Sequence, residues 1–240
     1  MKNLFRSGLL ILTGIFIITS CNQNEFTTQS SEVNLEVYSL LKKTLANDLD
    51  QLAIGLRNNK GERSKIAVDV AKNYYGENTK QFDAFNQSVD LVRQSSSTGR
   101  VSSQLNLSDF QRAEVDIIVS KTKELSDILE FKEYMNSEFT RYASSDLGIE
   151  DKNFMLTFIT MFEVNFEFMV SNPDLFQDEI SNGRVNGFWG CVVGVVSLTV
   201  VVGVTVAALS NPVGWALIAG DWYLIASAGA ASVVTIYNEC

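Results

Sequence analysis

Residues 154–169 read FMLTFITMFEVNFEFM, and this stretch decides the fold. Within it a phenylalanine stands at every fourth position, at Phe154, Phe158, Phe162 and Phe166. Because an α-helix completes one turn in about 3.6 residues, side chains four positions apart lie on the same face. The spacing therefore predicts a helix whose aromatic face is buried in the core of a helical bundle, an interpretation that we prefer to a ligand-binding stripe.

Two acidic residues of the same stretch, Glu163 and Glu167, lie one helical turn apart. A carboxylate pair is one route to acid–base chemistry, but a solvated helix face explains it more simply. The chain has no histidine, which removes the commonest general base and the usual partner in zinc sites. It also has no glycine-rich phosphate loop, CxxC pair or calcium loop. We therefore predict no enzyme, no cofactor and no metal site; an enzyme would need a carboxylate cluster in a pocket.

Helical spacing continues toward the N-terminus. Apolar residues three or four positions apart predict a first helix of about 25 residues; they are Val37, Leu41, Leu45, Leu49, Leu52 and Leu56. Glycines at positions 61 and 76 separate further helical stretches near 63–75 and 78–95. The serine-rich run 95–99 is the expected exposed loop.

Local signals mark further helix ends. Ser108 and Gln111 fit a capping box, which predicts a helix start at residue 108 or 109. Asn172-Pro173 ends the aromatic helix and can start a short one, because proline is tolerated at the first helical position. With 46% hydrophobic residues and only 2 prolines, long uninterrupted helices are favoured. We predict an all-α chain in which residues 33–182 form a helical bundle.

The charge of the chain excludes one class of partner. The formal net charge is −9, and removal of residues 1–20 takes away Lys2 and Arg6 but no acid, which leaves −11. Binding of nucleic acid needs clustered lysine and arginine. We therefore predict no nucleic-acid partner.

The N-terminus resembles a bacterial lipoprotein signal. Residues 1–6 carry two positive charges, residues 9–18 form a ten-residue apolar core, and Ile18-Thr19-Ser20-Cys21 follows. This order resembles the lipobox, in which an aliphatic and two small residues precede a cysteine that receives a diacylglycerol. The resemblance implies a signal peptide over 1–20 and lipidation of Cys21 as the first mature residue. A plain cleaved signal or an uncleaved membrane anchor is the alternative, although the apolar core falls short of the roughly 20 residues that span a bilayer.

The residues after Cys21 bear on location and mobility. In the lipoprotein family an aspartate after the cysteine retains many members in the inner membrane, and Asn22 stands here instead. This favours the outer membrane of a Gram-negative bacterium. The polar stretch 21–32 has no apolar period and is expected to be a flexible tether.

The C-terminal segment is almost free of charge. There is no charged residue between Arg184 and Asp221, and residues 188–209 are 22 uncharged positions, enough for a membrane helix. Nine of these 22 positions are valine, so a buried strand stays open as an alternative. A third possibility is that the segment is the buried centre of the helical body.

Two cysteines set a register for this segment. If Cys21 is lipidated, Cys191 and Cys240 are the remaining thiols, and an even pair in an oxidising compartment favours a disulfide. A tight turn at Asn211-Pro212 would leave them roughly 12 Å apart along a helix, too far for the bond. A longer turn over 210–220 pairs residue 209 with about 221 and residue 191 with about 239 or 240. We predict a membrane-type, disulfide-closed helical hairpin over 185–240, with arms of roughly 28 Å.

Small and aromatic residues fit such a hairpin. Small residues provide two faces for close helix contact, and the set comprises Gly190, Gly194, Ala226, Gly229 and Ala230. Side chains suited to a membrane interface lie at the two ends of the arms, and the set comprises Trp189, Asp221, Trp222, Tyr223 and Tyr237. We expect the lipid bilayer as partner and self-association of the hairpin as an option.

The polar run 181–184 precedes the apolar segment and is a place where proteases cut. Cleavage after Arg184 would release a 56-residue peptide; an uncut linker is the alternative. The arrangement resembles hydrophobic bacteriocin precursors of the sporulation-delaying-protein type, which implies a processing protease and a membrane-permeabilising peptide. The resemblance covers residues 184–240 and consists of composition and the two cysteines. The rival hypothesis is a non-catalytic envelope lipoprotein whose hairpin is a core or a docking element for a membrane partner.

Overall fold

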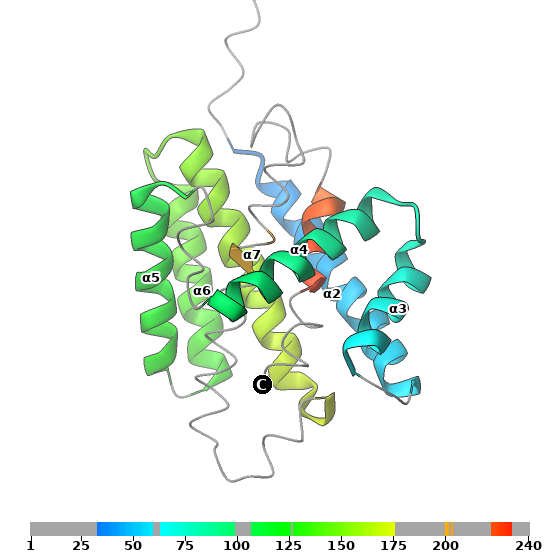
Figure 1. Cartoon of the computed structure of the whole chain (residues 1–240). Coiled ribbons are helices and arrows are strands. Elements are labelled where there is room, and N and C mark those ends of the chain that lie inside the picture. Colours follow the sequence, from blue (N-terminus) through cyan, green and yellow to red (C-terminus); the bar gives the residue numbers. More distant parts are fainter. Residues whose placement is uncertain are drawn as a thin grey trace, which may run out of the picture. The chain divides into compact units, whose positions relative to one another are not determined.

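The computed structural model (Figure 1) describes residues 33–59, 63–98, 107–125, 127–175, 200–201, 203 and 222–231. These residues are helical with short connections, and none of them is in a strand. The chain is therefore all-α over the described part. The labelled elements are α2 (Leu35–Asn58), α3 (Arg63–Tyr75), α4 (Lys80–Thr98), α5 (Asp109–Glu124), α6 (Ile128–Ala143), α7 (Ile149–Ser171) and the short 3₁₀ helix η2 (Pro173–Leu175). A further helix spans Trp222–Ala231.

The elements from Asn34 onward belong to one compact unit. The signal peptide, the tether at 21–32 and the boundary near 183–184 that the sequence predicts lie outside the described residues.

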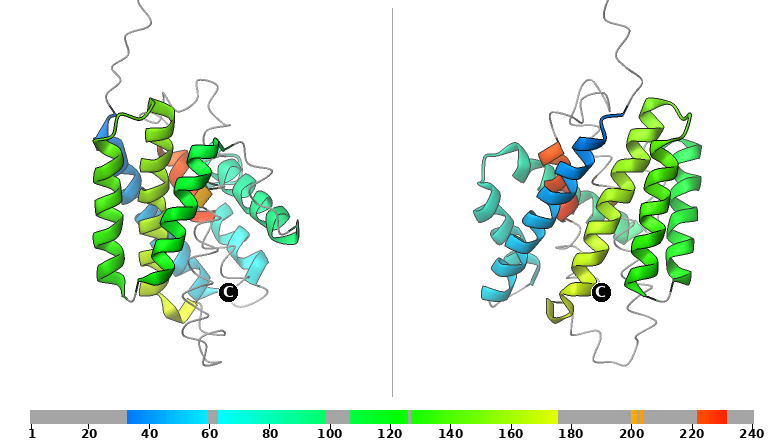
Figure 2. Two further views of the ribbon diagram at one scale, coloured as in Figure 1. Left: turned by 90° about the vertical axis from the view of Figure 1, so that its left-hand side faces the viewer. Right: turned by 180° about the vertical axis from the view of Figure 1, so that it is seen from behind.

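Helix α7 is the central element. It packs against α2, α5 and α6, and Figures 1 and 2 show it between α2 on one side and the α5–α6 pair on the other. All four phenylalanines of its stripe are buried, so the predicted core-facing helix is confirmed. The ring of Phe131 in α6 lies 4.2 Å from that of Phe166, centroid to centroid. Because α7 buries residues on every side, it has the character of a core helix.

Helix α2 lies along α7. All six apolar residues that predicted it are buried, and the helix spans 24 residues, so the prediction is confirmed. The Asn34 side chain accepts a hydrogen bond from the Glu36 amide and caps the start. At the other end, the Arg57 guanidinium donates to Asp174 at 2.7 and 2.9 Å and to Asn172 at 2.7 Å. These bonds join the end of α2 to η2, which begins at Pro173 as predicted.

The region of α3 and α4 agrees with the sequence in part. Helix α3 has the predicted limits, and it ends at Gly76, whose φ of +88° favours glycine. Helix α4 continues to Thr98, so the expectation of a loop over the serine run is wrong for residues 95–98. Serine costs only about 0.5 kcal/mol relative to alanine inside a helix, so a helix already formed can continue through several serines.

Helix α5 begins as predicted. The Ser108 hydroxyl accepts the Gln111 amide at 3.1 Å, and the Ser108 amide donates to the Gln111 side chain at 3.2 Å. This is the reciprocal capping box. The Gln111 side chain also donates to Asp151 of α7 at 2.8 Å, which joins the start of α5 to the start of α7.

Candidate functional site

The described part of the C-terminal segment is buried inside the helical body. Helix Trp222–Ala231 lies beside α2 in Figures 1 and 2. Its residues 224–231 are buried, as are Val200 and Val201. Val200, Val201 and Gly203 are helical, so the strand alternative does not hold at these positions. The described part of the segment thus forms part of the protein core, the third possibility that the sequence left open.

This helix approaches its neighbours closely at Gly229. A methyl group in place of its hydrogen would lie 2.5 Å from the Cε of Met161 in α7 and 3.5 Å from both terminal methyl groups of Leu45 in α2. Ala226 and Ala230, on the same small-residue face, are fully buried. The helix therefore packs against both α2 and α7, and at residue 229 only a glycine hydrogen fits while Met161 keeps its position. We call this surface, defined by Leu45 and Met161, the α2–α7 groove.

A second close approach joins the two halves of the C-terminal segment. A methyl group at Gly203 would lie 3.3 Å from the carbonyl carbon and oxygen of Ala228, and 3.0 Å from Met161 Cε. The backbones of residues 203 and 228 are thus neighbours, and the Cε of Met161 lies close to both Gly203 and Gly229. Sequence reasoning missed Leu45 and Met161 as partners of this segment, because no local signal marks a contact between residues so far apart in the chain.

The side chains from 224 to 231 include one polar group, the hydroxyl of Ser227. Ser227 is fully buried, and its hydroxyl donates to the carbonyl of Leu224 in the same helix at 3.0 Å. A buried hydroxyl without a partner would be costly. Because the partner here belongs to the same helix, this hydrogen bond does not depend on the groove.

Polar contacts hold α2 against α7 at several levels. The Tyr38 hydroxyl donates to Asn153 at 2.8 Å near the start of α2. Lys42, one turn before Leu45, forms an ion pair with Glu163 at 2.7 Å. The other member of the predicted carboxylate pair, Glu167, pairs with a lysine of α6 at 3.2 Å. Glu163 and Glu167 therefore join α7 to two different neighbours and do not form one acidic site.

A buried carboxylate joins α2 to α3. Asp48 is 5% exposed, and it accepts hydrogen bonds from the hydroxyls of Tyr74 at 2.8 Å and Tyr75 at 2.9 Å. Burial raises the pKa of Asp48, and the two tyrosine hydrogen bonds partly oppose the shift. Burial and the adjacent carboxylate raise the pKa of Tyr74 to about 12. We did not single out Asp48 from the sequence, although its position between Leu45 and Leu52 on the apolar face was a usable signal.

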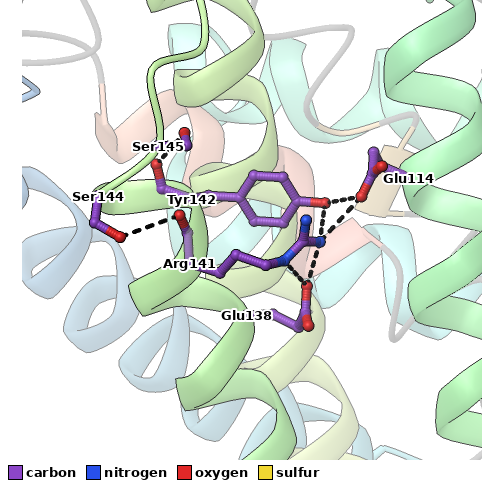
Figure 3. A network of polar contacts seen from close by, with 6 residues as sticks. All are labelled: Glu114, Glu138, Arg141, Tyr142, Ser144 and Ser145. Carbon is purple, nitrogen blue, oxygen red and sulfur yellow. Dashed lines mark hydrogen bonds and ion pairs between the residues drawn. The ribbon is translucent and has the colours of Figure 1, made fainter.

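A third polar cluster joins α5 to α6 (Figure 3). Arg141 donates to Glu114 at 3.0 Å and forms an ion pair with Glu138, and Tyr142 donates to Glu114. Burial of Glu114 acts to raise its pKa, but the hydrogen bonds from Tyr142 and Arg141 prevail and hold the pKa below its usual value. The one guanidinium is shared between the two carboxylates, one from each helix, so the cluster binds α5 to α6.

The remaining predicted site residues lie outside the described part of the chain. They are Cys21, Arg184, Trp189, Gly190, Cys191, Gly194, Asp221, Tyr237 and Cys240. Trp222 and Tyr223 are described: both are half-buried, and their rings meet edge to face with centroids 6.2 Å apart. Among the described residues, no three His, Cys, Asp or Glu side chains group as a metal site would require.

The sequence was compared with family models and curated proteins, and the fold with solved structures. Nothing matches. Within the described residues, α7 is long and apolar enough to cross a membrane, but 78% of its apolar window is buried inside the protein. Such burial is typical of the core helix of a bundle.

Proposed function

We propose that the chain is a lipid-anchored envelope protein whose helical body holds an apolar, membrane-inserting C-terminal segment. The observation that carries the proposal is the burial of helix Trp222–Ala231 in the α2–α7 groove through a face of glycine and alanine. An uncharged helix of this kind needs protection from water until it reaches a membrane. The body supplies that protection, and the lipid on Cys21 keeps the protein at the membrane surface.

The contact between Gly203 and Ala228 supports a hairpin in this segment. The register proposed from Cys191 and Cys240, with a turn over 210–220, pairs residue 203 with about residue 227. The observed neighbour of Gly203 is Ala228, one position away. Helix Trp222–Ala231 is about 15 Å long at 1.5 Å per residue, so a membrane-spanning arm requires the helix to continue toward Tyr237.

The polar groups of the helix also suit a transfer into lipid. Hydrocarbon satisfies no hydrogen bonds, so a polar side chain must bring its own partner. Ser227 does this through the Leu224 carbonyl. Lipid is as apolar as the groove, and the helix therefore loses packing contacts but gains no unsatisfied hydroxyl when it leaves the body for a bilayer.

In this proposal, proteolysis after Arg184 cuts the peptide bond that links the segment to the body, and a membrane then takes up the segment. The released peptide then acts as an antibacterial toxin that permeabilises a competitor's membrane. The experiment compares dye leakage from anionic lipid vesicles for the uncut mature chain, the chain cut after Arg184 and the isolated 185–240 peptide. Leakage is expected from the peptide, and lack of both leakage and growth inhibition would exclude the toxin function.

A matched pair of peptide variants makes the experiment sharper. Ser227→Asp places a charge six residues inside the proposed arm. A charge costs roughly 2.5–3.5 kcal/mol at the centre of a membrane helix, and this variant is expected to abolish leakage. Asn238→Asp adds the same charge beside Glu239 at the proposed interface and is expected to leave leakage unchanged. Equal leakage from both variants would contradict insertion of this helix.

The alternative is a non-catalytic envelope lipoprotein in which the C-terminal helix is a permanent part of the core. The close fit at Gly229 favours it, because packing of this density is typical of protein interiors. The two functions differ when the chain is cut in the presence of vesicles. A permanent core element stays with the body, whereas a membrane-inserting segment moves to the vesicle fraction in a flotation assay.

A further inference from the structure

The helix that occupies the α2–α7 groove is one continuous apolar element, whereas α2 and α7 are joined by contacts that do not include it. The Tyr38–Asn153 hydrogen bond of 2.8 Å lies near one end of α2. At the other end, Arg57 donates a hydrogen bond of 2.7 Å to Asn172, the residue that caps the end of α7. The Lys42–Glu163 ion pair of 2.7 Å lies between them, one turn from Leu45. None of these bonds involves a residue of helix Trp222–Ala231.

Helix α7 has a second support on its far side. Phe131 of α6 packs on Phe162 and Phe166, with ring centroids 5.7 and 4.2 Å away. Lys132 forms an ion pair with Glu167 at 3.2 Å. The contacts of α7 with α2 and α6 therefore do not involve the C-terminal helix.

The shape of the groove selects its occupant. Gly229 meets the tip of Met161, and fully buried alanines lie on the same face at Ala226 and Ala230. A helix with a larger residue at the central position would meet Met161 and Leu45. The groove thus fits a helix that presents a small–x–x–small–small face, which this chain carries at 226–230.

We infer that the α2–α7 groove is a receptor for the chain's own C-terminal helix, and that the cut body keeps and rebinds the segment. The body then acts as an inhibitor of the peptide it carries. This inference rests on the proposed function for its biological meaning. Cleavage alone does not release the segment into water; a bilayer must compete for it, so transfer occurs only where a membrane is in contact.

The test uses the mature chain with a specific protease site placed between residues 183 and 184. After cleavage without detergent, the two fragments are expected to co-elute from a size-exclusion column as a 1:1 complex with unchanged helical circular dichroism. Separation of the fragments, or loss of helical signal on cleavage, would overturn the inference.

A competition experiment tests specificity without altering the body. The probe is a fluorescent peptide of residues 220–233 with a solubilising lysine tail, added to the cut complex. The wild-type peptide is expected to bind saturably, and the Gly229→Leu peptide at least tenfold more weakly. A Leu224→Met peptide, changed on the opposite side of the helix from Ala226, Gly229 and Ala230 by a substitution that conserves volume, is the matched control and is expected to bind as wild type. Equal binding of all three peptides would show that the groove does not select its occupant.

Leakage separates the failure of this inference from the failure of the proposed function. If the free 185–240 peptide and the cut complex cause vesicle leakage at the same rate, the body is no inhibitor. The inference then fails, while the membrane activity of the peptide stands. If the fragments stay bound and select the wild-type peptide but the free peptide causes no leakage, the receptor stands and the toxin function fails.

Discussion

The contact between Met161 and Gly229 allows a quantitative prediction from two substitutions. Gly229→Leu places a side chain where even a methyl group would lie 2.5 Å from Met161 Cε. Overpacking of a core costs about 1–3 kcal/mol, and leucine recovers about 1 kcal/mol because it is a better helix former than glycine. We expect Gly229→Leu to lower the free energy of unfolding by about 2 kcal/mol, near the upper end because four carbons are added.

Met161→Ala tests the same contact from the other side. Met161 is fully buried, and truncation of a buried methionine to alanine costs about 2–5 kcal/mol. In the double variant the new leucine occupies the space that Met161 vacates. We therefore expect a favourable coupling energy of at least about 1 kcal/mol, within the range seen for residues in contact.

The assay is urea unfolding of the mature chain, followed by circular dichroism at 222 nm, for the wild type, both single variants and the double variant. A control cycle uses Met155→Ala in place of Met161→Ala. Met155 is a buried methionine of α7 about two turns earlier, and we expect its substitution to be additive with Gly229→Leu. Additivity of the Met161 and Gly229 substitutions within about 0.5 kcal/mol would refute the placement of the C-terminal helix against α7.

Three further predictions concern the helical body. Burial raises the pKa of Asp48 above its ordinary value of 3.8, so the folded chain holds this proton more tightly than the unfolded chain. The stability of the wild type relative to Asp48→Asn is therefore expected to be highest below pH 3.8 and to fall as pH rises through the raised pKa. Urea unfolding of both proteins between pH 3 and 7 measures this. A difference in the free energy of unfolding that does not change with pH would contradict the burial. Gly55→Ala places a methyl group 2.3 Å from a Val70 methyl carbon, and we expect it to lower the free energy of unfolding in urea by about 1–3 kcal/mol. In the control variant Gly148→Ala the new methyl group meets nothing within 4 Å, and we expect a change of less than about 0.5 kcal/mol. Ser108→Ala removes the cap of α5 and should lower stability by about 1 kcal/mol, seen as a reduced melting temperature; an unchanged melting temperature would mean that the capping box contributes nothing.

The sequence predicted the helices of the body because their signals are local. The spacing of leucines in α2 and of phenylalanines in α7 and the capping box at Ser108 each lie within a few turns of chain. The loop predicted over the serine run was wrong because serine, although common in loops, is only mildly unfavourable in a helix. Local signals thus gave the elements and erred at one boundary.

The groove itself was not predictable in the same way. Leu45 lies more than a hundred positions before Met161, and Met161 lies more than sixty positions before Gly229. No period or motif links the three residues. The small-residue face at 226–230 indicated that some helix would approach closely, but the partner helices emerge only from the fold. The predictions on Cys21, Cys191, Cys240 and Arg184 concern residues that the structure does not describe, and they stay predictions.

The position of Met161 has a chemical consequence. Its terminal methyl group lies against both Gly203 and Gly229, and the side chain is fully buried. Oxidants reach a thioether only when it is accessible, and a sulfoxide adds a polar oxygen to an apolar side chain. Met161 is therefore a probe of groove occupancy. The rate of its conversion to the sulfoxide under mild peroxide, measured by mass spectrometry, would report how often the helix leaves the groove. Once oxidised, it would also obstruct the return of the helix.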